Sequence, residues 1–309
     1  MSFILKQGNS LFKIGGNMFA SLGFNFKYLT SAAIGNVAGA ATQWNAGMTI
    51  DDVAGLIYTV INNGTKLVLV AYDLNTFNLV ATFDILNPAS VGYRLVLNRA
   101  KNILYITRYL YVDIVDLNTM NITGTITVPD GQHIFDATIN TDGSILFVST
   151  SYPKVYSFET TNYTVLKSYQ LPNPDAYTPA SKICYDSRRN QLWGFIPNSA
   201  TPFTILDAST FLVAKTLTDA GSGFTLNDGS NNMYYDADND VIFKTGSAQW
   251  AHTAYCDLIK CATLEILLRY IAVPNGDGDM YNTYIWRKSN TTKLYYMLGS
   301  NNIRVHKKQ

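Results

Sequence analysis

Few residues of this chain combine the type and the spacing that catalysis needs. Three histidines are present, and His133 is followed three positions later by Asp136, a pairing that could form a general base or part of a metal site. The alternative role for the pair is a hydrogen bond within the loop that precedes an apolar strand. The sequence has no Gly-x-Ser-x-Gly elbow, no phosphate-binding loop and no dinucleotide fingerprint. We therefore expect no catalytic residue, and we keep His133 and Asp136 as candidate binding residues.

Two acidic runs have the alternating carboxylates of a calcium loop. The first, residues 236–240, falls where the chain repeatedly places a polar hairpin turn, so we interpret it as a turn. The second carries Asn275, Asp277 and Asp279 and is a weak calcium candidate. Neither run has the glycine and the closing glutamate of an EF-hand. We expect no cofactor.

The cysteines and aromatic residues offer little more chemistry. Cys184, Cys256 and Cys261 lack metal-type spacing, so we expect reduced thiols packed as small apolar groups; a Cys256–Cys261 disulfide across a predicted turn is the alternative. Tyrosine occurs 21 times. Tyr152 and Trp250 lie in or beside turns, where an aromatic ring with a polar tip suits ligand binding, and both are candidate binding residues.

The elements that would position these residues are short strands in a repeat of about 40 to 50 residues, a period typical of propeller blades. One marker is a polar turn followed by an aliphatic residue and an aromatic one. It occurs at Ile57-Tyr58, Leu104-Tyr105, Leu146-Phe147, Leu192-Trp193, Ile242-Phe243 and Leu294-Tyr295. A second marker is an acidic turn that precedes another strand. It occurs at residues 73–76, 116–119, 158–161, 207–210 and, loosely, 257–260.

These patterns predict an all-β fold: a single six-bladed propeller of four-stranded blades, with seven blades as the alternative if residues 38–49 and part of the N-terminal segment form another sheet. The last unit has only three strands, so we expect an N-terminal strand within residues 24–36 to complete it and close the ring. The predicted propeller spans residues 24–309. Its blades are expected at about 46–86, 90–128, 132–171, 177–218, 224–273 and 278–309.

Residues 1–23 precede the repeat and form an apolar leader punctuated by glycine. Polar and glycine residues interrupt every apolar run, so we expect no secretory signal. Exposed apolar groups usually seek a partner surface, and the leader is a candidate docking segment; folding back on the propeller is the alternative. Its candidate docking residues are Phe3, Ile4, Leu5, Leu11, Phe12, Met18 and Phe19.

Composition limits the classes of partner. Charged residues make up 15% of the 309-residue chain and the net charge is +1, which gives no electrostatic case for nucleic acid or an anionic membrane. No apolar run reaches the length of about 18 residues that a transmembrane helix needs.

One unit resembles a known repeat family. Residues 128–148, reading VPDGQHIFDATINTDGSILFV, resemble the YVTN-type β-propeller repeat, in which a proline-glycine loop leads to an inner strand, an Asp-Gly turn and an aliphatic-aromatic strand. The other units match only in hydrophobic pattern. The resemblance implies a propeller, and propellers host hydrolases, oxidoreductases, scaffolds and binders.

The leader and the composition rich in Asn, Tyr, Thr and Gly are similar to bacteriophage virion proteins, such as tail or fibre components. This likeness implies localisation in a virion that is assembled in the host cytoplasm. We therefore expect a non-enzymatic structural or binding module, docked through its leader to other virion proteins, with a cell-surface receptor as a further candidate partner. The alternatives are a YVTN-like or lactonase-like hydrolase with a channel site and a carbohydrate- or receptor-binding propeller.

Overall fold

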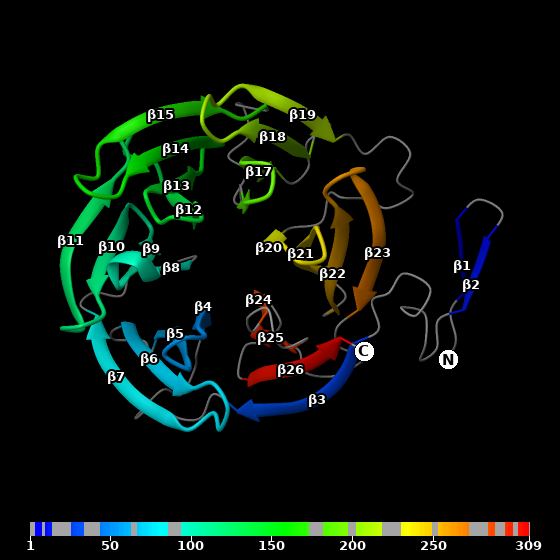
Figure 1. Ribbon diagram of the computed structural model, residues 1–309, viewed down its shortest axis with the longest axis horizontal. Helices are drawn as coiled ribbons and strands as arrows, with labels where there is room; N and C mark the ends of the chain where they lie inside the picture. Colours follow the sequence, from blue (N-terminus) through cyan, green and yellow to red (C-terminus); the bar gives the residue numbers. More distant parts are fainter. Residues whose placement is uncertain are drawn as a thin grey trace.

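The computed structural model describes residues 4–7, 10–13, 26–33, 44–62, 67–85, 94–172, 182–196, 202–217, 230–248, 253–271, 284–287, 294–298 and 302–308. Within these ranges the chain forms four-stranded antiparallel sheets around a central axis, and the first strand of each lies innermost (Figure 1). The fold is an all-β propeller. Within the same ranges, no helix is both long and apolar enough to cross a membrane.

Five blades each consist of four strands that follow one another in the sequence. From the innermost to the outermost strand they are β4 (Trp44–Asp51), β5 (Leu56–Asn62), β6 (Leu67–Asp73) and β7 (Leu79–Ile85); β8 (Leu95–Asn98), β9 (Ile103–Arg108), β10 (Tyr111–Asp116) and β11 (Asn121–Thr127); β12 (Ile134–Ile139), β13 (Ile145–Thr150), β14 (Lys154–Glu159) and β15 (Val165–Gln170); β16 (Lys182–Asp186), β17 (Gln191–Phe195), β18 (Phe203–Asp207) and β19 (Val213–Leu217); and β20 (Ser230–Asp236), β21 (Val241–Ala248), β22 (Thr253–Lys260) and β23 (Glu265–Ile271). A single 3-10 turn, Arg99–Lys101, follows β8 in the described chain.

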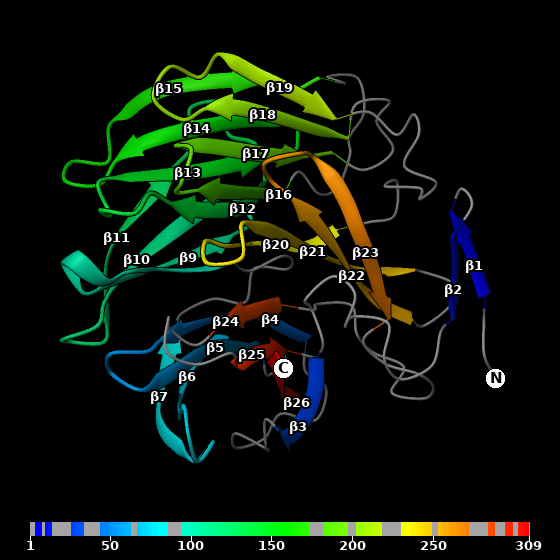
Figure 2. The same ribbon diagram turned by 45° about the vertical axis from the view of Figure 1, so that its right-hand side comes forward.

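The sheet that completes the ring is composite. Its first three strands are β24 (Tyr284–Arg287), β25 (Leu294–Leu298) and β26 (Asn302–Lys308), and its fourth is β3 (Phe26–Ala33) from the other end of the chain. β3 pairs antiparallel with β26, with Ala33 opposite Asn302 and Phe26 opposite Lys308, so the predicted closing strand is present. The views in Figures 1 and 2 both place β3 on the outside of this sheet.

The predicted count of six blades, with seven as the alternative, is corrected to five blades of consecutive strands and one composite sheet. Residues 44–49, which the seven-blade alternative assigned to an extra sheet, belong to β4, the innermost strand of the first blade. The leader supplies β1 (Ile4–Gln7) and β2 (Ser10–Lys13), which pair as a two-stranded sheet. Within the described residues, β1 and β2 pair only with each other and belong to no four-stranded sheet.

The turn before an outermost strand shows why the acidic marker repeats. The Asp73 carboxylate accepts hydrogen bonds from the backbone N–H groups of Asn75 at 3.0 Å and Thr76 at 2.7 Å. Phe77 then adopts a left-handed φ of 59°, and its N–H donates to the Asp73 carbonyl at 2.9 Å. In the fifth blade the predicted marker is wrong: Asp257 lies inside β22, and the turn comes later and ends at the left-handed Leu264.

Each described outermost strand also contains a bulge, which in the five blades of consecutive strands comes just after this turn. One residue of the strand has no partner in the ladder, so the strand bends and twists locally. The bulged residues are Val80, Thr123, Leu166, Ala214, Leu267 and, in β3, Leu29.

The aromatic residue of the first marker is a core residue that packs against the next blade. Tyr105 lies among Ile134 and Leu146 of the third blade, and Phe147 among Ile183 and Leu192 of the fourth. Both aromatic side chains are fully buried. Burying such a side chain contributes about 1.5–3 kcal/mol to stability. The marker therefore recurs because neighbouring blades are joined by the same kind of contact.

Polar turns join the blades as well. The Asn98 amide donates to the Gly143 carbonyl at 2.8 Å, which links the second blade to the third. Gly143 has a φ of 74°, and the Asn98 side chain occupies the place where a Cβ would stand. Arg99 pairs with Asp51 and thereby links the second blade to the first.

Candidate functional site at the ring axis

An arginine spans the axis of the ring. Arg94 precedes β8 in the second blade, and its Nη1 donates to the Asn232 side-chain oxygen on β20. Its Nη2 donates to the carbonyl of Met233 at 3.2 Å. Figure 1 shows β8 and β20 facing each other across the centre of the ring. Arg94 is 6% exposed and Asn232 is 1% exposed, so the contact is buried.

A carboxylate and an ammonium group from two more blades join this contact. Asp136 on β12 lies 3.4 Å from Arg94 Nε and accepts the backbone N–H of Ile183 at 2.9 Å. Lys182, next to Ile183 on β16, donates to the Phe135 carbonyl at 3.2 Å. Burial lowers the pKa of Lys182, and the charge of Asp136 opposes that shift. Charged groups from three blades are therefore held against one another at the axis.

A cavity of about 270 Å³ extends from Arg94 toward the turns that join innermost to second strands. Its size is near the lower end for a small-molecule pocket. The innermost strands β4, β8, β12, β16 and β20 supply most of its wall. The lining residues that carry hydroxyl, thiol or charged groups are Thr49, Asp52, Arg94, Arg99, Thr138, Cys184, Tyr185, Tyr234 and Tyr235.

Burial favours the neutral form of three weakly acidic groups of this wall, Cys184, Tyr185 and Tyr235. The pKa of the Cys184 thiol is raised well above its usual range, mainly by burial. The pKa values of Tyr185 and Tyr235 are also raised, again mainly by burial. A neutral thiol is a poor nucleophile and a neutral phenol is a hydrogen-bond donor, so these groups suit binding better than covalent or acid–base catalysis.

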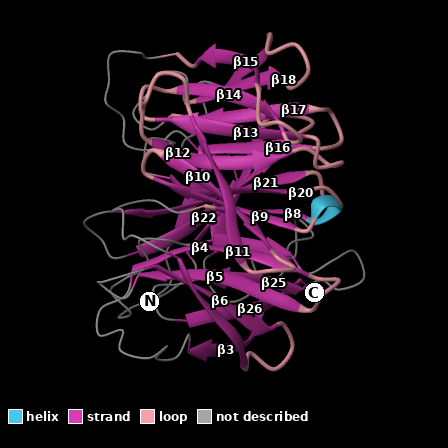
Figure 3. Cartoon of the chain, turned by 90° about the vertical axis from the view of Figure 1, so that its left-hand side faces the viewer, coloured by secondary structure: helices cyan, strands magenta, loops and turns pink. Residues whose placement is uncertain are grey.

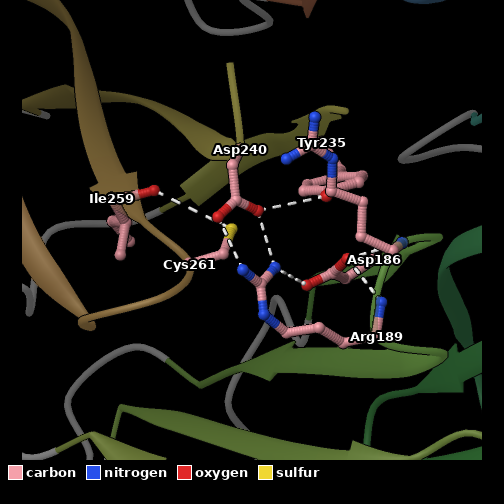
Figure 4. Close-up of polar contacts among 7 residues, drawn as sticks. Asp186, Arg189, Tyr235, Asp240, Ile259 and Cys261 are labelled. Atoms are coloured by element: carbon pink, nitrogen blue, oxygen red, sulfur yellow. Dashed lines mark hydrogen bonds and ion pairs between the residues drawn. The ribbon is translucent and has the colours of Figure 1, made fainter. Parts of the chain in front are cut away.

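A second polar cluster joins the fourth and fifth blades beside the cavity (Figure 4). Arg189 Nη1 donates to Asp186 at 2.8 Å and to Asp240 Oδ1 at 2.6 Å, and its Nη2 donates to Asp240 Oδ2 at 2.5 Å. The Tyr235 hydroxyl donates to Asp240 at 3.2 Å. The hydrogen bonds from Arg189 lower the pKa of Asp240. This fork-shaped pairing is the strong form of a charge-assisted hydrogen bond.

The same cluster contains the atoms of a possible metal site. The ligand atoms of Asp186, Asp240 and Cys261 all lie within 4.8 Å of one another. The guanidinium of Arg189 lies between the two carboxylates (Figure 4), and it supplies the positive charge that a cation would otherwise bring. Burial raises the pKa of the Cys261 thiol, which opposes its use as a thiolate ligand. We therefore interpret the cluster as an ion-pair junction between blades.

The structure separates the environments of His133 and Asp136. The His133 ring packs on the ring of Tyr109 with centroids 3.7 Å apart, and its carbonyl accepts the Ser151 N–H at 2.8 Å. Asp136, 1% exposed, belongs to the buried network around Arg94. Their role as binding residues stays a prediction.

The other predicted site residues lie in a turn, in the leader hairpin or outside the described residues. Tyr152 is 47% exposed in the turn after β13. Candidate docking residues Ile4, Leu5, Leu11 and Phe12 belong to the β1–β2 hairpin. Outside the described residues lie Phe3, Met18, Phe19, Trp250, Asn275, Asp277 and Asp279.

Sequence reasoning missed the axial residues Arg94, Lys182 and Asn232. Their signal was available: each stands at the start of an innermost strand, just before an apolar run. A polar residue at the same position in several repeat units predicts a polar cluster at the axis, because equivalent positions of a closed ring lie at one level.

Comparison with known proteins supports the fold. No family model matches the chain, and no curated protein matches its sequence. Among solved structures, 1523 chains match. One is from a crystal structure of a mitotic checkpoint complex, with a TM-score of 0.60 and 12% identity over 89% of this chain and 77% of that chain. The matched chain is a WD40-like propeller.

At that identity the likeness shows the fold alone, and propellers serve many functions. The comparisons show neither a YVTN-type relative nor a virion relative. What the geometry and the comparison show together is an all-β propeller, a fold suited to binding and protein interaction.

Proposed function

We propose that this protein is a non-enzymatic binding module of a larger protein assembly. The observation that carries the proposal is the state of the ionisable groups at the axis. Arg94 and Asp136 are buried in contact with each other, and burial holds the Cys184 thiol and the Tyr235 phenol neutral. Acid–base catalysis needs groups that exchange protons near neutral pH. Lys182, whose pKa burial lowers, donates to the Phe135 carbonyl and so serves the contact between blades, and an axis of paired charges and neutral donors stabilises a rigid ring.

The outer surface supports a role in protein contacts. Aliphatic residues at the start of the outermost strands are exposed in four consecutive blades, although apolar groups usually lie inside. They are Leu79 at 52%, Val80 at 56%, Ile122 at 39%, Val165 at 42%, Leu166 at 48%, Leu212 at 69% and Val213 at 45%. Aliphatic groups repeated around the rim favour contact with other proteins.

We propose further that the assembly is a bacteriophage virion, in which the protein is a tail, collar or fibre component. Support comes from the low fraction of charged residues and from the composition rich in Asn, Tyr and Thr. Its partners would be other virion proteins, with a cell-surface receptor as a second class of partner. We propose that it is assembled into the virion in the host cytoplasm.

The leader hairpin is the proposed attachment point. β1 and β2 pair in the register Ile4 opposite Lys13 and Gln7 opposite Ser10. Figures 1 and 2 both show the hairpin outside the ring of blades. An isolated two-stranded hairpin is at best marginally stable in water, so a partner surface would stabilise it.

The test is incorporation into particles. Purified virions that contain the full chain should lose it when residues 1–23 are deleted, and also when Leu5 and Phe12 are both replaced by Ser. The control Val53→Ser changes an exposed aliphatic residue in the turn between β4 and β5, away from the outermost strands, and should leave incorporation unchanged. Incorporation is measured by quantitative mass spectrometry, and circular dichroism checks that each ring is folded.

Two results would count against the proposal. Normal incorporation of the folded leader-deletion variant overturns the docking role. Absence of the full chain from every purified particle fraction overturns the virion assignment.

A further inference from the structure

We propose that the cavity at the ring axis binds a neutral monosaccharide, either as a free sugar or as the end unit of a glycan. This inference does not depend on the assembly role, which leaves the cavity unused. The cavity has a volume of about 270 Å³. Pockets for drug-sized ligands measure about 300–1,000 Å³, so a single sugar ring is the size of ligand that this cavity can enclose.

The cavity has a buried floor and an accessible mouth. Arg94, Leu95 and Met233 are buried at its inner end. At the other end the side chains of Asp52 and Arg99 are 33% and 38% exposed. Figure 3 views the ring from the side and shows the 3-10 turn that begins at Arg99, drawn in cyan, at the right-hand face. A small molecule therefore enters from that face and reaches as far as Arg94.

The charged side chains of the cavity wall already pair with opposite charges of the protein. Among the described lining residues, the charged ones are Asp52, Arg94 and Arg99. Arg94 Nε lies 3.4 Å from Asp136, and Arg99 pairs with Asp51 and, at 3.2 Å, with Asp52. A charged ligand would lose its hydration without gaining a counter-charge, which is costly. The wall therefore favours an uncharged ligand.

The wall also offers backbone hydrogen-bonding groups. Each innermost strand ends the order of its sheet, so its edge toward the axis has no partner strand within the described chain. At the floor, the Met233 carbonyl and the Ile183 N–H bond to side chains of the buried network around Arg94. Alternate residues of an antiparallel strand direct their backbone groups the same way. Tyr185 and Tyr235, two residues nearer the mouth, therefore direct theirs toward the axis.

A sugar ring matches the chemistry of this wall. Its hydroxyl groups both donate and accept, which suits a strand edge that presents N–H and C=O groups in turn. Thr49 and Thr138 add hydroxyl groups to the wall, and Ile50, Leu97 and Ile139 add aliphatic surface for the C–H groups of the ring. A purely apolar ligand would displace water from the backbone groups and leave them without hydrogen bonds. A neutral monosaccharide satisfies both kinds of surface.

Titration of the full chain with sugars, followed by saturation-transfer NMR, tests the proposal. The probes are glucose, galactose, mannose and N-acetylglucosamine, and the uronates of the three hexoses are their charged counterparts. We expect at least one neutral sugar to bind with a Kd of about 1 mM or lower, and its uronate to bind at least about tenfold more weakly. The methyl glycoside of the bound sugar distinguishes the two sources. Equal binding of the glycoside indicates the end unit of a glycan, and much weaker binding indicates the free sugar.

Two variants that fill the cavity locate the binding site. Thr138→Trp on β12 and Ile50→Trp on β4 place a bulky ring on the wall from two different blades, and each should weaken binding at least about tenfold. The matched control is Thr82→Trp, at an exposed position of the outermost strand β7, which should bind like the wild type. Circular dichroism checks that each ring is folded.

Three results would overturn the proposal. The first is a wild type that binds none of the neutral sugars. The second is a uronate that binds as tightly as its neutral parent. The third is a folded cavity-filling variant, Thr138→Trp or Ile50→Trp, that binds as tightly as the Thr82→Trp control.

Discussion

Replacing Arg189 by Met should weaken the junction between the fourth and fifth blades. The change keeps much of the side-chain volume and removes the guanidinium that binds Asp186 and Asp240. The two carboxylates then face each other without their shared cation. Asp186 is fully buried and Asp240 is 16% exposed as a side chain, so solvent screens their repulsion poorly.

The expected loss of stability can be bounded. Removing one partner of a fully buried ion pair costs about 3–5 kcal/mol. Arg189 is 28% exposed as a side chain, and solvent screening lowers the figure to about 2–3 kcal/mol. With an unfolding entropy of about 2.1 cal/mol/K per residue, this loss lowers the Tm of a 309-residue chain by about 3–5 °C.

The loss should depend on pH in a known direction. In the wild type, hydrogen bonds from Arg189 lower the pKa of Asp240. The pairing therefore stabilises the fold fully above the unfolded-state pKa of about 3.9. This stabilisation is lost as the pH falls through the lower pKa of Asp240 in the folded state. In the variant, mutual repulsion raises the carboxyl pKa values, and a proton bound on acidification relieves it. The stability gap between wild type and variant should therefore be largest near neutral pH and shrink toward pH ~5.

Urea unfolding at both pH values measures the effect. The matched control is Arg188→Met, which removes the same charge from the exposed neighbouring position. Equal stability of the Arg189 and Arg188 variants at neutral pH would refute the reasoning, as would a gap that does not shrink on acidification.

Three further predictions concern other buried groups. The side chains of Lys244 and Asp257 are 0% and 1% exposed and lie 3.5 Å apart. Lys244→Met should lower the free energy of unfolding, measured in urea, by about 3–5 kcal/mol, because it leaves the Asp257 carboxylate buried without a partner. Adding Asp257→Leu should restore most of the lost stability. Gly143→Ala should cost about 1–3 kcal/mol, because its left-handed φ and the amide packed against it leave no room for a methyl group; an unchanged Tm would contradict this. Cys184 and Cys261 are buried thiols with raised pKa values, so iodoacetamide mapping should find them unmodified until the chain unfolds.

The repeat made the propeller predictable because its markers report local physical needs. An aromatic residue after a polar turn packs against the next blade, as Tyr105 and Phe147 do, and an acidic residue before a tight turn binds backbone N–H groups, as Asp73 does. The acidic turn recurs in the first four blades. In the fifth blade the acidic marker predicts the wrong position for the turn. Asp257 lies within a strand there, and its carboxylate pairs with the buried Lys244.

The candidate site was less predictable because it is built across blades. Arg94 reaches Asn232 from 138 residues away along the chain, and no local spacing encodes that distance. Arg189 and Asp240 meet in the same way, between equivalent turns of neighbouring blades. His133 and Asp136 were conspicuous because they stand close together in the sequence. Strand β12 begins between them and contains a bulge before Asp136, so the two side chains lie in different surroundings.

The pairing of β3 with β26 also sets the order of events during synthesis. The strand that completes the last sheet emerges from the ribosome before any blade, and the strand it needs emerges after all five. Blades built from consecutive strands can form as they appear, whereas the circle stays open until translation reaches residue 308. Contacts between such distant segments form slowly. The nascent chain therefore carries an unmatched strand for most of its translation, and an unpaired strand edge is open to non-native pairing during that time.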